Sequence, residues 1–285
     1  GINIIENFAA ESELKTEEYY ESSFLGYISV LSGYLYNDPG SMSEIVVGND
    51  IKIALLDTGI DDHAELSDAL SVSRNVTGYS NEHYSANYNA GIMLADRDAN
   101  DIHGIAYKSK LIDIKTHDID DSGHIYSETN WITSGINQAV SDGADIINVR
   151  NEAINDYDVT SADYTNLKTA INNATKSSVE KIIVTEIGDT SDGDRDPLKL
   201  AEIASDTSTT NGLMLAVGGI DGNGDITSYS RYCRTVKDYC LTTYTDSIKS
   251  LHLDDNLVTH SSTDSAASTV SGVLALMTEA FPATL

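Results

Sequence analysis

The chain has 285 residues, with 45 Asp or Glu against 17 Lys or Arg, so its formal net charge is −28 at pH 7. A surface this acidic repels phosphate groups, which makes nucleic acid and anionic lipid poor partners. Hydrophobic residues make up 40% of the chain, which is enough for a packed core and excludes a disordered acidic tail. No apolar run reaches the ~18 residues of a membrane span, so we expect no direct membrane insertion by this segment.

The first predicted element is a helix over residues 11–36. Apolar side chains between Phe24 and Leu35 recur at steps of four, three and four residues, which places them on one face of a helix. This segment comes before the first predicted strand. We therefore expect residues 1–50 to form a helical segment that packs on the outside of a domain over residues 51–285.

Short runs rich in Ile, Val and Leu follow, and such runs are typical of strands that are buried on both faces, as in a parallel sheet. They cover residues 51–57, 111–115, 145–149, 181–187 and 213–217. Helical patterns lie between and after them, at residues 127–141, 161–177 and about 264–280. This alternation predicts one α/β domain with three α/β/α layers and a mainly parallel central sheet.

Two turn-like stretches are strongly acidic. The first offers oxygen ligands that make Asp189, Asp192, Asp194 and Asp196 weak candidates for a calcium site. The second, residues 221–225, lacks the distal Glu of a calcium-binding loop and lies between two apolar runs. We interpret it as a polar hairpin turn.

The two cysteines, Cys233 and Cys240, are seven residues apart. They can close a short loop if the backbone reverses between them, and they can equally be two unrelated buried thiols. The sequence holds no C-x-x-C motif, which argues against a zinc site.

Four segments occur in this order along the chain: IALLDTGID at 53–61, GIAYKSKL at 104–111, ADIINV at 144–149 and SAASTVSG at 265–272. Together they resemble the subtilisin-like serine proteases, the peptidase S8 family. The resemblance covers roughly residues 15–285 and implies the family's α/β fold and a Ser–His–Asp catalytic triad. The family's domain normally continues beyond the last helix, so the resemblance also implies a domain truncated at its C-terminus.

Four further segments are TEEY at 16–19, YSRYC at 229–233, DYCL at 238–241 and AFP at 280–282. They give the chain a closer resemblance to the passenger domains of bacterial autotransporter subtilases. This resemblance implies a disulfide between the two cysteines. It also implies export in a Gram-negative bacterium to the cell surface or the extracellular space, where disulfides persist.

The family's catalytic positions are only partly retained. The catalytic Asp corresponds to Asp57, and the stretch at 85–91 resembles the family's HGTHVAG motif, in which we assign the catalytic His to Tyr88. The nucleophilic Ser corresponds to Asp264, and the oxyanion-hole Asn corresponds to Asp189. The family's substrate edge corresponds to Arg150, Asn151 and Glu152.

Each replacement removes a chemical function. A tyrosine with an ordinary pKa near 10 cannot act as the base at neutral pH, so Tyr88 does not replace the imidazole. Asp264 has no hydroxyl to activate, and an ionised Asp189 repels a developing oxyanion. Glu152 adds bulk and charge where a substrate backbone should lie. Replacement at so many positions indicates natural divergence rather than an engineered inactivation.

No neighbouring residue restores the triad. His83 lies five residues before Tyr88 and is expected to be an exposed loop residue, and Ser265 points about 100° away from Asp264 on a helix. The remaining histidines show no metal-ligand spacing: His63, His103, His117, His124, His252 and His260.

We therefore predict a pseudoprotease, a secreted binding or structural module with an unidentified protein or surface ligand. The alternatives are a hydrolase of another class that uses Asp57 and Asp264, and a residual S8 serine endopeptidase. In the binding module we expect the hydroxyl of Tyr88 to donate to Asp57 and plug the cleft. The clustered carboxylates need a positive charge, either Arg150 or a calcium ion; we favour Arg150, because only three carboxylates are placed with certainty. No other cofactor is expected.

Overall fold

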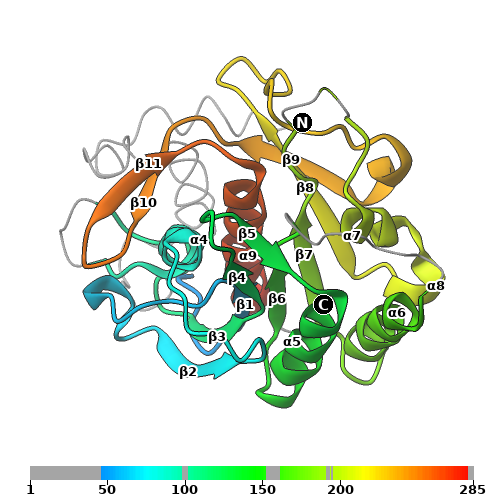
Figure 1. Ribbon diagram of the computed structural model, residues 1–285, viewed down its shortest axis with the longest axis horizontal. Helices are drawn as coiled ribbons and strands as arrows, with labels where there is room; N and C mark the ends of the chain where they lie inside the picture. Colours follow the sequence, from blue (N-terminus) through cyan, green and yellow to red (C-terminus); the bar gives the residue numbers. More distant parts are fainter. Residues whose placement is uncertain (1–45, 98–101, 152–160, 191–192, 194, 282–285) are drawn as a thin grey trace.

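A parallel sheet of seven strands forms the centre of the computed structural model, which describes residues 46–97, 102–151, 161–190, 193 and 195–281 (Figure 1). Its strands, in spatial order, are β2 (Leu70–Asn75), β3 (Lys110–Lys115), β1 (Lys52–Asp57), β6 (Ile146–Val149), β7 (Ile182–Glu186), β8 (Met214–Ile220) and β9 (Cys240–Tyr244). Every neighbouring pair is parallel. The five predicted strands are confirmed. The two edge strands, β2 and β9, have mostly exposed or half-buried side chains and so give no apolar run.

Helices cover both faces of the sheet and give the predicted three layers. The longer helices are α4 (Ser85–Leu94), α5 (Thr129–Ser141), α6 (Ala162–Thr175) and α9 (Thr263–Ala280), and the one-turn helices are α7 (Lys199–Glu202) and α8 (Thr207–Thr210). In β1, Ile53 and Leu55 face the core that includes α4 and α9, whereas Ala54 and Leu56 face the core that includes α5 and α6. Alternate residues of a strand point to opposite faces, which explains why residues 53–56 of β1 are all apolar.

Two small hairpins and three 3₁₀ turns complete the described structure. They are β4 (His117–Ile119) with β5 (Ile125–Ser127), β10 (Ile248–Leu251) with β11 (Leu257–His260), and the turns η3 (Ala64–Leu66), η4 (Ile203–Ser205) and η5 (Arg234–Tyr239). The β10–β11 hairpin packs on α4, and the chain passes from β11 directly into α9 (Figure 1).

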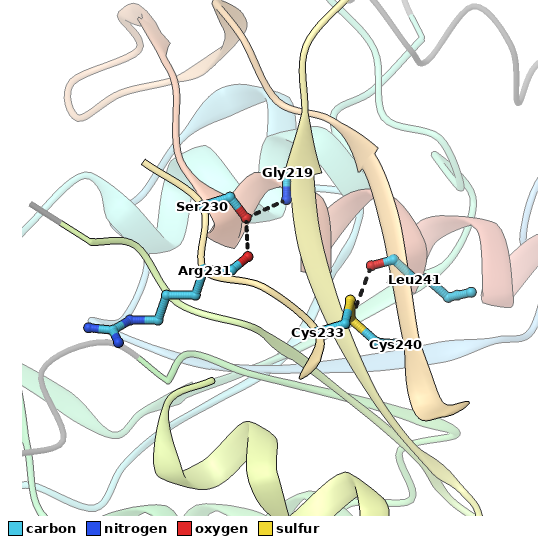
Figure 2. The surroundings of a disulfide bond; sticks show 6 residues. All are labelled: Gly219, Ser230, Arg231, Cys233, Cys240 and Leu241. Atoms are coloured by element: carbon cyan, nitrogen blue, oxygen red, sulfur yellow. Dashed lines mark hydrogen bonds between the residues drawn. A yellow bond between two sulfur atoms is a disulfide. The ribbon is translucent and has the colours of Figure 1, made fainter. Parts of the chain in front are cut away.

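The predicted disulfide is present. Cys233 and Cys240 are bonded, with their Cα atoms 5.9 Å apart, and η5 spans the loop between them. Figure 2 shows that the preceding segment is also fixed to β8: Ser230 Oγ accepts a hydrogen bond from the Gly219 N–H at 3.0 Å and donates to the Arg231 carbonyl at 2.9 Å. The disulfide bond therefore closes a loop at the start of the edge strand β9.

The acidic stretch 221–225 is a turn, as predicted. The Asp221 N–H donates to the Asp225 carbonyl at 2.8 Å, and a single antiparallel bridge joins Ile220 to Ile226. The Asp221 carboxylate accepts from the N–H groups of Asn223 and Asp225, so it stabilises the turn itself.

Several predictions lie outside the described residues, namely the helix over 11–36 and the positions Glu152, Asp192 and Asp194. Within the described part of the chain, no helix combines the length and the apolar character that crossing a membrane requires.

The order of the strands places a switch point between β1 and β6. The chain passes from β1 to β2 and β3 on one side of it and later places β6 on the other side. In open α/β sheets, the carboxyl ends of the two strands at such a switch point border a ligand crevice. Asp57 ends β1, and Arg150 follows β6, with its N–H donating to the Leu56 carbonyl at 3.1 Å.

Candidate functional site

Asp57 is the buried centre of this crevice, with 1% of its surface exposed. Its Oδ1 accepts a hydrogen bond from the Thr58 N–H at 2.7 Å. Its Oδ2 accepts from Ser85 Oγ at 3.1 Å and from Asn89 Nδ2 at 2.8 Å. Ser85 and Asn89 lie four residues apart on α4, so they share one face of the helix, and that face is turned toward the end of β1.

Tyr88 lies elsewhere, so the prediction that its hydroxyl donates to Asp57 and plugs the cleft is wrong. The hydroxyl donates instead to the carbonyls of Ile248, at 3.3 Å, and His260, at 3.1 Å, in the β10–β11 hairpin. Burial raises the pKa of the Tyr88 phenol well above its ordinary value. The α4 side chains that stand beside Asp57, where a triad places its imidazole, are Ser85 and Asn89. The i, i+4 pair of polar residues on α4 was the available sequence signal.

Arg150 joins the two acidic sides of the crevice. Its Nη1 donates to Asp264 Oδ2 at 2.6 Å and to Ser85 Oγ at 2.7 Å, and both charged side chains are more than nine-tenths buried. The predicted pairing of Arg150 with a site carboxylate is therefore confirmed. Burial on its own would raise the pKa of Asp264, but the guanidinium of Arg150 and the hydroxyl of Ser262 hold that pKa below its ordinary value.

Asn89, which was not predicted from the sequence, completes the network. Its amide Nδ2 lies 2.8 Å from Asp57 Oδ2 and 3.4 Å from Asp264 Oδ2, and its Oδ1 accepts from Ser268 Oγ at 3.0 Å. The amide nitrogen therefore faces both carboxylates. Asp57 at the end of β1 and Asp264 in the first turn of α9 face one crevice, as predicted.

Asp189, which the resemblance assigns to the oxyanion position, lies on the loop after β7. Its Oδ1 accepts the N–H of Thr263 at 3.0 Å, so its carboxylate binds the start of α9. A carboxylate in this orientation is a hydrogen-bond acceptor, whereas an oxyanion needs donors. Glu186 is the last residue of β7. It is buried, and its Oε1 accepts the N–H of Asn151 at 2.5 Å, so it fixes the residue after Arg150.

A pocket of about 450 Å³ remains open beside the network. Its lining is His83, Gly123, His124, Ile125, Arg150, Asp189 and Leu198. His83 is half-buried at this rim rather than exposed in a loop, since its Nδ1 accepts the Ser85 N–H at 3.1 Å. Burial lowers the pKa of His83. The end of β1 is thus filled by side chains, while the adjoining pocket stays accessible.

The described residues contain no group of three or more His, Cys, Asp or Glu side chains suited to holding a metal ion. Of the calcium candidates that can be placed, Asp189 binds the start of α9, and Asp196 pairs with Arg234. Ser265, considered as a displaced nucleophile, donates to the Ser262 carbonyl at 2.7 Å.

Comparison with known proteins agrees with the fold and the crevice. The subtilase family, Peptidase S8, matches residues 48–284. The chain therefore belongs to the subtilase family.

Its curated relatives include proteases. The Major intracellular serine protease of Bacillus subtilis is 28% identical over 248 residues, which are 84% of this chain and 72% of that protein. The Thermostable alkaline protease of Halalkalibacterium halodurans is 25% identical over 240 residues, 83% of this chain and 59% of that protein. The Minor extracellular protease Epr of Bacillus subtilis is 30% identical over 106 residues, 36% of this chain and 16% of that protein.

Solved structures share the fold. The Prenylagaramide maturation protease PagA superposes with a TM-score of 0.68 at 22% identity, over 83% of this chain and 78% of that one. MycP1 with its N-terminal propeptide removed superposes with a TM-score of 0.65 at 20% identity, over 83% of this chain and 80% of that one.

Proposed function

We propose that this subtilase domain is a catalytically inactive pseudoprotease that serves as a secreted or surface-exposed binding or structural module. The observation that carries the proposal is the position of Arg150. Its guanidinium lies at the centre of the crevice, 2.6 Å from the carboxylate of Asp264 and 2.7 Å from the hydroxyl of Ser85.

This arrangement opposes serine-protease chemistry at each step. The triad needs a base beside Asp57, but the Ser85 hydroxyl is no base at neutral pH, and it already donates to Asp57. It needs a nucleophile at the start of α9, where Asp264 offers a carboxylate paired with Arg150. A guanidinium stays charged throughout the physiological range, so Arg150 cannot take a proton from a nucleophile.

The two carboxylates are also poorly suited to a hydrolase of another class. An aspartic dyad shares one proton between its carboxylates, and a glycosidase needs one carboxylic acid that stays protonated near neutral pH. Arg150 instead lowers the pKa of Asp264 and keeps it ionised. The Asn89 amide donates to both Asp57 and Asp264, which is the hydrogen bonding expected of two carboxylates rather than of a shared proton.

A fluorophosphonate probe and a casein cleavage assay test the proposal. The wild-type protein should show no labelling and no cleavage. A restored variant that combines Ser85→His, Arg150→Ser, Asp189→Asn and Asp264→Ser should gain labelling at position 264. The matched control carries the first three substitutions and keeps Asp264, and it should stay unlabelled. Stoichiometric labelling of any serine in the wild type, together with casein cleavage, would instead identify a residual S8 endopeptidase.

Export in a Gram-negative bacterium to the cell surface or the extracellular space belongs to the same proposal. The disulfide supports it, because such bonds persist in oxidising compartments. The names of the relatives do not decide the location, since one is an intracellular protease and another an extracellular one. Fractionation of the native host, with the protein detected in the medium or on intact cells, is the test; detection only in the cytoplasm would contradict export.

A further inference from the structure

The last residue of β3, Lys115, is a buried lysine whose ammonium is surrounded by oxygen atoms. Its Nζ lies 2.9 Å from the Thr58 carbonyl, 2.9 Å from the Asn81 carbonyl, 3.0 Å from the His117 carbonyl and 3.2 Å from Asp118 Oδ1. The side chains of Lys115 and Asp118 are 8% and 2% exposed. We name these four oxygen atoms the oxygen cage.

The composition of the cage is that of a cation site. Carbonyl and carboxylate oxygens are the ligands that hard cations use in proteins, and carbonyl oxygens replace the water shell of potassium in channels. We propose that the oxygen cage is a monovalent-cation site whose resident ion is the tethered ammonium of Lys115, and that this ion holds one wall of the crevice together. The inference does not depend on the proposed function, because it concerns the wall rather than the reaction.

The cage connects three segments that border the crevice. Thr58 directly follows Asp57, Asn81 lies in the segment that leads to His83 and α4, and Asp118 lies in β4, part of the hairpin that lines the open pocket. Two further hydrogen bonds join the same segments: Asn81 Nδ2 donates to Asp118 Oδ2 at 3.1 Å, and Thr58 Oγ1 donates to the His83 carbonyl at 3.1 Å. The single positive charge at their centre compensates the buried Asp118.

Loss of the ammonium would leave the cage oxygens facing one another. A buried carboxylate and buried carbonyls without donors are costly, far more so than the loss of a surface contact. Lys110 provides the contrast on the same strand, because its exposed ammonium donates to one carbonyl, that of Asp68, at 2.7 Å. Lys110 is therefore the matched control position.

The experiment compares Lys115→Ala, Lys115→Met and the control Lys110→Ala by thermal unfolding and hydrogen exchange. Lys115→Met should lower the Tm by about 6–10 °C, because it breaks a buried charge pair. Exchange should rise together in the backbone around Thr58, Asn81 and His117, and stay unchanged in β8. Lys110→Ala should show neither effect.

Cation rescue distinguishes a cage from ordinary packing. Lys115→Ala vacates the cage, so ammonium or potassium chloride at about 0.2 M should raise its Tm more than tetramethylammonium chloride at the same ionic strength, which controls for screening of this acidic chain. Wild type and Lys110→Ala should respond equally to all three salts. If Lys115→Ala folds only in ammonium or potassium, the same conclusion holds. Equal responses to the three salts, failure to fold in all of them, or a Lys115→Met Tm loss as small as that of Lys110→Ala would overturn the proposal.

Discussion

Two buried aspartates, Asp113 and Asp264, lie in the same domain, and their pKa values are shifted in opposite directions. Asp113, in β3, accepts hydrogen bonds from Ser73 Oγ at 2.6 Å and from the Ile60 N–H at 3.2 Å, and its pKa is raised to about 6. Asp264, in α9, is paired with Arg150, and its pKa is lowered. Both side chains are at least nine-tenths buried.

The difference shows that burial alone does not decide the charge of this site. Desolvation raises the pKa of both carboxyls, and for Asp113 the nearby Asp57 adds to it while two neutral donors and Lys115 offset it only in part. For Asp264 the guanidinium of Arg150 outweighs desolvation, so the pKa is lowered instead of raised. Arg150 therefore allows an acid to replace the family's nucleophile without leaving a buried charge uncompensated.

The largest expected effect comes from Arg150→Met, which removes the guanidinium and leaves Asp264 buried. We expect a loss of about 3–5 kcal/mol in the free energy of unfolding at pH 7, measured by urea denaturation. The sign of the pH dependence should also change. In the wild type, the contribution of Asp264 is present above its unfolded pKa and is lost as the pH falls; in the variant, stability should rise as the pH falls, because the carboxyl then takes up a proton.

Arg74→Ala is the matched control for this substitution. Arg74 donates to Asp142 through Nε at 3.0 Å and Nη2 at 2.9 Å, but its side chain is 43% exposed. An exposed pair contributes little, so this loss should be far smaller than that of Arg150→Met. If Arg150→Met and Arg74→Ala lost similar amounts of free energy of unfolding, burial would not make the Arg150–Asp264 pair more important than an exposed pair.

The next effect in size concerns Asp113→Asn. Because the folded-state pKa of Asp113 is about 6 and lies above the ordinary value of 3.8, the folded protein binds this proton more tightly than the unfolded chain. Its contribution is fully present at low pH and is lost as the pH rises from about 4 to about 6. The free energy of unfolding of the variant, measured relative to wild type, should therefore rise by about 2–3 kcal/mol between pH 4 and pH 7. A difference between the two proteins that stays constant over this range would contradict the raised pKa.

The smallest expected effect is that of a chelator. If Arg150 rather than a calcium ion compensates the carboxylates, removal of divalent cations should leave the Tm nearly unchanged in differential scanning calorimetry. A drop of more than about 5 °C, equivalent to more than ~2 kcal/mol at this size, would favour a bound cation. Addition of calcium after chelation, with magnesium as the control, would then identify the ion.

The sequence by itself determined the elements that are buried on both sides. The apolar runs of β1, β3, β6, β7 and β8 were predicted because a parallel strand covered by helices on both faces has no polar side. The edge strands β2 and β9 were missed because most of their side chains are exposed or half-buried and the apolar pattern is absent.

Several residues of the candidate site were predicted from the sequence, but most of the hydrogen bonds that join them were not. Motif order placed Asp57, Asp264 and Asp189 at one crevice, and charge balance correctly predicted that Arg150 pairs with a site acid. The assignment of Tyr88 beside Asp57 was wrong, and Asn89 was missed. Both errors concern the rotation of α4 about its axis, which sets the face of the helix that is turned toward Asp57.

Only the tertiary structure decided that rotation. Ser85 and Asn89 lie on the α4 face that meets the end of β1, while Tyr88 turns its hydroxyl to carbonyls in the β10–β11 hairpin, about 160 to 172 residues later in the chain. A local sequence pattern carries no information on contacts made over such a separation, since they depend on where the hairpin packs. The sequence therefore placed Asp57, Arg150 and Asp264 at the crevice, and the packing of distant segments determined which residues of α4 join them.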